Sequence, residues 1–217
     1  MRRRGVGGVG AFLTALAAAG CGEAPAIVAQ EGSIVFTDVT ILPMDRPGAV
    51  PGQSVVVTGD RITAVGPAES IEAGEGATVI DGSGRFLMPG LAEMHAHVPP
   101  GANPPRDAVE DILFLYVANG ITTIRGMLGS EYQIPLAEEL RSGDVLGPAF
   151  YVGAPSINGN SAPTPADAER LIRAHAAAGY DLQKIHPGVG LATWNHMFDA
   201  AAEAGLTYGG HVPPAVG

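Results

Sequence analysis

The chain contains one lysine, Lys184, beside eleven arginines. Arginine keeps its proton in proteins, whereas lysine can become a neutral, reactive amine. Lys184 lies in the strand-like run 180–185, and three histidines lie near other strand-like runs: His95 and His97 in His-Ala-His, and His211 in Gly-Gly-His-Val. A single lysine also falls somewhere by chance, so its position relative to these histidines decides its meaning. We interpret Lys184 as a candidate for chemistry.

His95 and His97 are separated by one residue, so a β-strand would present both imidazole rings on one face. Neutral imidazole is the commonest nitrogen ligand of zinc-like metal ions. His186 follows Lys184 by two residues, so we expect it to share that strand face and to line a substrate pocket. Tyr208, close to His211, is a further candidate for the pocket.

Composition describes a folded, acidic protein. Its 217 residues are 46% hydrophobic and 16% charged, which suffices for a buried core. The formal net charge is -10, and there is no basic patch. An acidic surface repels phosphate, so nucleic acid is excluded as a partner.

The N-terminus has the pattern of an export signal. Arginines at 2–4 precede the apolar stretch 6–20, which is too short to cross a bilayer, and Ala18-Ala19-Gly20-Cys21 resembles a bacterial lipobox. Cys21 is the only cysteine, so no internal disulfide can form and a lipid site explains the exported thiol. We expect a lipoprotein signal peptide over 1–21, lipidation of Cys21, a tether over 22–32 and a membrane-anchored, exported protein. An ordinary secretory signal is the alternative.

Residues 33–84 are expected to form a small β-sandwich segment. Strand-like runs cover 33–42, 54–58, 61–65 and 78–81, and Gly59-Asp60 is a two-residue hairpin signal. From 85 to 217, strand-like runs at 86–91, 121–124, 149–152, 182–185 and 206–208 alternate with helical candidates at 107–118, 134–141, 166–178 and 192–204. Thr164 and Pro165 should begin the third of these helices and Gly179 should end it.

This alternation predicts an α/β fold with about five of the eight units of a TIM-like (β/α)8 barrel. His95 and His97 would then lie at the C-terminal end of the first barrel strand, where barrel enzymes place their active sites. His175 and His196 fall on predicted helices and are interpreted as surface or packing residues.

The run from Thr78 to His97, which contains Gly-Arg-Phe-Leu-Met-Pro-Gly-Leu-Ala-Glu-Met-His-Ala-His, resembles the signature of the metal-dependent amidohydrolase superfamily. Residues 120–125 and 180–185 are similar to its second-strand and fourth-strand segments. The resemblance covers about 32–217 and is strongest to the imidazolonepropionase-like and prolidase-like branch.

The resemblance implies two divalent metal ions, with zinc the expected metal. His95 and His97 would hold one ion, Lys184 carboxylated on its ε-nitrogen would bridge both, and His211 would bind the second. Such a pair activates water and polarises a scissile carbonyl. The expected substrate is a small amide or dipeptide, and no oligomeric state is implied.

The resemblance also implies a sixth-strand histidine and an eighth-strand aspartate, whereas this sequence stops after its fifth strand-like run. We therefore expect 85–217 to be a truncated barrel and the 217-residue chain to be inactive alone. The leading hypothesis is a hydrolase of amide or peptide C–N bonds. Alternatives are hydrolysis of a cyclic amide, lactone or phosphoester at the same metals, and a non-catalytic lipoprotein that serves as a binding module.

Overall fold

The computed structural model describes residues 26–217, which form two compact units divided between Pro89 and Gly90. The expected signal peptide, the lipidated Cys21 and the start of the tether lie outside the described residues. No helix within 26–217 is long and apolar enough to cross a membrane.

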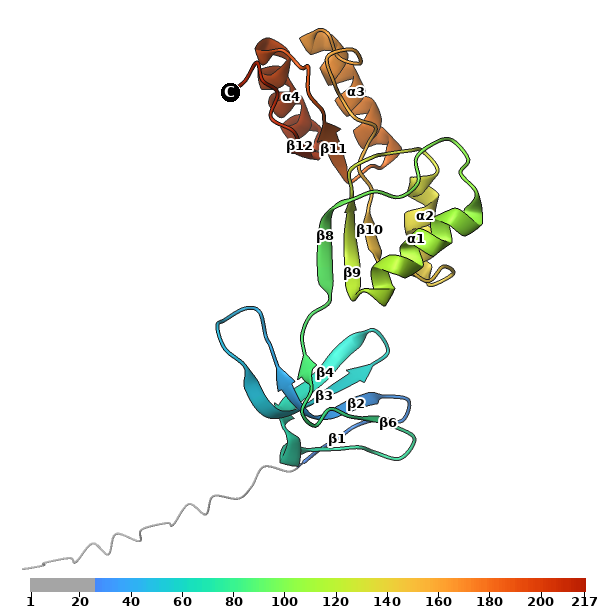
Figure 1. The fold of residues 1–217 in the computed structure, drawn as a ribbon, viewed down its shortest axis with the longest axis vertical. Helices are drawn as coiled ribbons and strands as arrows, with labels where there is room; N and C mark the ends of the chain where they lie inside the picture. Colours follow the sequence, from blue (N-terminus) through green and yellow to red (C-terminus); the bar gives the residue numbers. More distant parts are fainter. Residues whose placement is uncertain (1–25) are drawn as a thin grey trace, which may run out of the picture. The chain divides into compact units, whose positions relative to one another are not determined.

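The first unit is built from β-strands (Figure 1). Its five-stranded sheet contains the antiparallel strands β4 (Arg61–Pro67), β3 (Val50–Thr58) and β2 (Ile34–Ile41), and β2 also pairs in parallel with β6 (Thr78–Asp81) and β7 (Phe86–Leu87). A separate parallel pair joins β1 (Ile27–Val28) to β5 (Ile71–Glu72), which follows the short 3-10 turn η1 (Ala68–Ser70). Ala29, Val35, Val56 and Ile71 form the core.

The Gly59-Asp60 signal is confirmed as the hairpin between β3 and β4. Thr58 and Arg61 are the last paired residues before the turn, and Gly59 has a φ of 61°. This left-handed conformation favours glycine at the first position of a two-residue hairpin loop.

The boundary between the units falls later than the expected division at 84/85. The run 86–91 is not one strand, because β7 ends at Leu87 and β8 begins at Leu91. Phe86 and Leu87 pair with Thr40 and Ile41 of β2, so they belong to the first unit. Pro89 and Gly90 separate the two strands, as expected of residues that interrupt regular pairing.

The second unit contains five parallel strands. β8 (Leu91–Ala96), β9 (Ile121–Gly126) and β10 (Ala149–Tyr151) form one sheet in the order β10-β9-β8, and β11 (Leu182–Ile185) pairs with β12 (Thr207–Gly210). Parallel bridges from Gly153 to Leu182 and from Ile157 to Ile185 connect the segment after β10 to β11. The strands therefore follow one another in chain order, which is the order of consecutive β-α units.

Four helices connect these strands: α1 (Arg106–Ala118), α2 (Gln133–Ser142), α3 (Pro165–Ala178) and α4 (Leu191–Ala204). Each lies within one or two residues of its predicted range. Leu113 of α1 and Leu136 of α2 pack in one core with Ile124 of β9. Ile172 of α3 and Met197 of α4 pack in a second core with Ile185 of β11. One face of each strand is thus covered by helices, which leaves the other face for the site.

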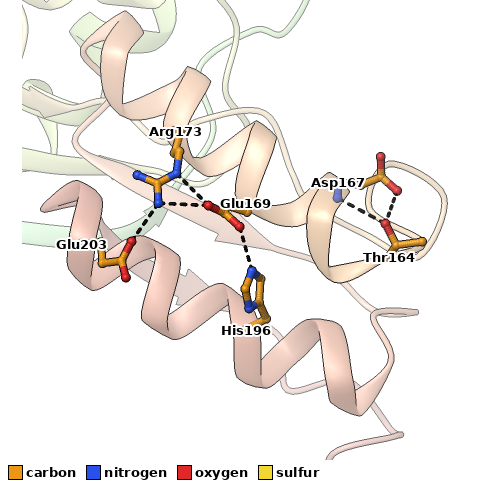
Figure 2. Close-up of polar contacts among 6 residues, drawn as sticks. All are labelled: Thr164, Asp167, Glu169, Arg173, His196 and Glu203. Carbon is orange, nitrogen blue, oxygen red and sulfur yellow. Dashed lines mark hydrogen bonds and ion pairs between the residues drawn. The ribbon is translucent and has the colours of Figure 1, made fainter.

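The start and end of α3 follow local sequence signals. Thr164 is its N-cap and its hydroxyl oxygen accepts a hydrogen bond from the backbone N–H of Asp167 at 3.3 Å, while Pro165 occupies the first turn. Gly179 ends the helix with a φ of 92°. These three predictions are confirmed, and Figure 2 shows the cap.

Helices α3 and α4 are joined on their exposed side by an ion network (Figure 2). Arg173 contacts Glu169 on its own helix at 3.0 Å and Glu203 of α4 at 2.7 Å. The Nε2 atom of His196 lies 2.9 Å from Glu169, so this histidine has the surface role predicted for it. Exposed pairs of this kind each contribute about 0–1 kcal/mol.

Candidate metal centre

β8 carries His95, and His97 follows the last residue of the strand; both lie on the face turned away from the helices. Ala96 and Val98 are buried in the core with α1 and α2, and the alternation of a strand places His95 and His97 on the opposite face. Their ring centroids are 5.5 Å apart. The carboxylate of Glu93 accepts a hydrogen bond from the backbone N–H of His95 at 2.8 Å, which fixes the end of the strand.

β11 is buried on both faces and presents Lys184 opposite its helix-facing neighbours. Ile185 packs between α3 and α4, and the side-chain oxygen of Gln183 lies 2.6 Å from Nδ1 of His175 on α3. The Gln183 amide donates to the carbonyl oxygens of Pro155 at 3.0 Å and Lys184 at 2.7 Å. Gln183 therefore anchors β11, and Lys184, only 2% exposed, points to the other face.

The amine of Lys184 meets the first histidine of the pair. Its Nζ lies 3.4 Å from Nε2 of His95, although 89 residues separate them in sequence. The first and fourth strands of the unit thus place their chemical groups together, as the sequence hypothesis requires.

The other two predicted histidines also lie together. His186 and His211 have ring centroids 5.0 Å apart, and their backbone N–H groups donate to Ile157 and Ile185 respectively. Tyr208 is placed differently: its ring is 4.3 Å from that of Phe198 of α4. Alternation along β12 puts Tyr208 on the helix-facing side, so the structure does not gather it with Lys184 and the histidines.

The electrostatics favour neutral nitrogen atoms at the centre of this group. Desolvation, followed by the nearby charges of Lys184, His97 and His211, lowers the pKa of His95 below its usual value. Burial, and then the charge of Arg125, lowers the pKa of Lys184. A neutral imidazole can ligate a metal, and a neutral amine can react with carbon dioxide.

Arg125 is a member of this site that the sequence analysis did not identify. It follows the buried Ile124 on β9, so it lies on the same face as the histidines, and its Nε donates to the carbonyl oxygen of Met94 at 2.9 Å. The sequence signal that could have identified Arg125 is a charged residue at a position of β9 that faces away from the helices.

The residues present suit a metal centre only if lysine takes part. Within 26–217, no three His, Cys, Asp or Glu side chains are placed to hold a metal ion by themselves. Instead Lys184 contacts His95, whose ring neighbours His97, while His211 forms a second pair with His186. Carboxylation would give the buried side chain two oxygens that share one negative charge, and imidazole nitrogen with carboxylate-like oxygen is a ligand set that zinc accepts. The donor set therefore fits the implied metals.

Comparisons with known proteins identify relatives of the chain. No family model matches it. The adenine deaminase 3 of Rhizobium meliloti (strain 1021) is 28% identical over 176 residues, which cover 75% of this chain and 29% of the deaminase. The enamidase of Eubacterium barkeri is 30% identical over 98 residues, 45% of this chain and 24% of the enamidase. A solved Xaa-Pro dipeptidase with bound methionine matches with a TM-score of 0.67 at 17% identity, over 83% of this chain and 56% of that one.

These comparisons support the amidohydrolase superfamily, whose members are metal-dependent α/β proteins. The relatives of the chain include hydrolases of C–N bonds: a deaminase, an amidase and a dipeptidase. The chain spans less than a third of the curated relatives named above and about half of the solved structure. Likeness to the dipeptidase at this identity establishes the fold alone.

Proposed function

We propose that this protein is a metal-dependent hydrolase of amide or peptide C–N bonds in small molecules, with its site on the inner face of the first five strands of a (β/α)8 barrel. The observation that carries the proposal is the contact between the only lysine of the chain and His95. Lys184 is 2% exposed, has no carboxylate partner in the described chain, and lies 3.4 Å from the imidazole. A lysine needed only for packing or charge has no reason to occupy this position.

Under this proposal His95 and His97 would hold one divalent ion, His211 would hold another, and carboxylated Lys184 would supply oxygen ligands. The bound ions would supply an activated water molecule and polarisation of the scissile carbonyl. The protein's own part is to keep His95 neutral, to bury Lys184 away from water, and to fix the end of β8 through Glu93.

The ligand set is tested by metal analysis of purified variants of the complete (β/α)8 barrel, loaded with zinc. The unmodified protein should retain two ions per chain, and Lys184→Arg and His95→Ala should each lose at least one. Hydrolysis of a panel of dipeptides, N-acyl amino acids and cyclic amides should fall at least about 100-fold in both variants, as for disrupted metal sites.

His196→Ala is the matched control, because His196 is a histidine of the same unit that contacts Glu169 on the helix surface. It should keep both the metal content and the activity. Full metal content and turnover in Lys184→Arg would exclude the carboxylated lysine, since a guanidinium cannot form a carbamate.

A further inference from the structure

Arg125 lies between the strand that carries His95 and the strand pair that carries Lys184. Its Nε donates to the carbonyl oxygen of Met94, the residue before His95, at 2.9 Å. On the other side, Gly209 pairs in register with Lys184, and a Cβ atom built on Gly209 would lie 4.0 Å from the guanidinium carbon and from Nη1 of Arg125. The guanidinium is thus hydrogen-bonded to the strand that carries His95 and lies close to the strand that pairs with Lys184.

The charge of Arg125 has no anionic partner in the part of the chain that the structure describes. No carboxylate there lies within 4 Å of its nitrogen atoms, and its two terminal nitrogens make no hydrogen bond to the described residues. Six other arginines of residues 26–217 do form ion pairs: Arg46, Arg61, Arg106, Arg141, Arg170 and Arg173. A half-buried guanidinium with free donors is suited to bind a planar pair of oxygens.

Carboxylation of Lys184 would create such a pair of oxygens beside the guanidinium of Arg125. The neutral amine attacks carbon dioxide, a C–N bond forms, one C=O bond becomes a C–O⁻ group, and the released proton goes to solvent. The side chain then carries a negative charge in place of the positive charge of an ammonium group. Arg125 therefore repels the uncarboxylated ammonium and attracts the carbamate.

We propose that Arg125 is a positioning residue that stabilises the carboxylated form of Lys184 and orients its two oxygens. This inference rests on the proposed function, because it presupposes that Lys184 is carboxylated. It adds a cationic partner from β9 that assists the modification even before a metal binds.

The test measures the carbamate directly in metal-free protein. The protein is equilibrated with ¹³C-labelled bicarbonate, and the carbamate carbon is quantified by NMR as the concentration of dissolved carbon dioxide increases. The concentration of carbon dioxide at which half of Lys184 is carboxylated should be at least about tenfold higher in Arg125→Gln. This is the effect expected for loss of a charged hydrogen-bond partner. Arg125→Lys keeps the charge but loses the planar fork of donors, so its carbon dioxide requirement should lie between those of the unmodified protein and Arg125→Gln.

A second pair of variants perturbs Arg125 without replacing it. Gly209 has an ordinary backbone conformation, and an added Cβ would meet Met127 at 3.7 Å and Arg125 at 4.0 Å, which are normal contact distances. Gly209→Asp should place a competing carboxylate against the guanidinium and weaken carboxylation. Gly209→Asn, of nearly equal size, is its neutral control and should weaken it less.

The outcomes separate this inference from the proposed function. Equal carboxylation in the unmodified protein, Arg125→Gln and Gly209→Asp would overturn the role of Arg125 and leave the metal site intact. A missing carbamate signal in the unmodified protein would overturn the carboxylated lysine, and this inference with it. If circular dichroism shows that Arg125→Gln does not fold, the comparison of Gly209→Asp with Gly209→Asn tests the role of Arg125 instead.

Discussion

Replacing Lys184 with methionine should stabilise the metal-free protein while removing a ligand of the proposed metal centre. Lys184 is 2% exposed, and its amine contacts Nε2 of His95 at 3.4 Å, beyond the usual range of a hydrogen bond. A buried polar group with a poor partner costs about 1–3 kcal/mol. Methionine has a similar unbranched shape and no amine. With about 4 °C of Tm per kcal/mol for a unit of this size, the Tm should rise by about 4–12 °C.

The increase in Tm of the methionine variant over the parent protein should become smaller as the pH rises. Burial, then the charge of Arg125, lowers the pKa of folded Lys184 below its ordinary value of 10.5. Between these two pKa values the unfolded chain binds more protons than the folded one, so the stability of the parent protein rises with pH. The free-energy cost of burying the charged amine is fully present below the pKa of Lys184 in the folded protein. This cost disappears as the pH approaches 10.5. The difference between the methionine variant and the parent should therefore shrink in the alkaline range.

The assay is thermal unfolding followed by circular dichroism, with a chelator and with buffers freed of carbon dioxide. Lys184→Arg is the control and should have the lowest Tm of the three proteins, because its charge cannot be removed by pH. A methionine variant no more stable than the parent at neutral pH would refute the reasoning. It would show that the amine is well satisfied in the fold, so that no stability is sacrificed for its chemistry.

Two further predictions concern other parts of the chain. Thr164→Ala removes the side-chain cap of α3 and should lower the free energy of unfolding by about 1 kcal/mol, whereas Thr164→Ser should not; equal loss in both variants of a denaturant titration would contradict the cap's role. Cys21→Ala should abolish incorporation of radioactive palmitate in a bacterial host, because Cys21 is the only cysteine and the predicted lipid site. Equal labelling of both proteins would rule the lipobox out.

Local signals predicted the elements of this fold more accurately than the boundaries between units. The caps of α3 and the β3–β4 hairpin depend on a few adjacent residues, and both occur where the sequence places them. The start of β8 was misplaced because residues 86–91 form one apolar run whose division depends on pairing with β2. That pairing is a long-range contact, which no local pattern encodes.

The site could be predicted only as a set of strand-end residues. Alternation predicted that His95 and His97 share a face, and their rings are 5.5 Å apart; it did not predict that His186 lies beside His211, because these residues follow different strands. The same rule, applied with the observed bounds of β12, turns Tyr208 toward Phe198 of α4. Arg125 was missed because its importance depends on two strands distant in sequence, one contacted at Met94 and the other at Gly209.

The Lys184–His95 contact has a consequence for the order of events during folding. Its two residues are 89 positions apart, so closing this contact in an unstructured chain carries a large entropic cost that grows slowly with loop length. Helices α1, α2 and α3 lie between them, and their local contacts form faster than long-range pairing. The contact is therefore made after the intervening units have assembled. Under the proposed function, carbon dioxide and metal would then react with strands that are already assembled, and their capture would report that this part of the chain has folded.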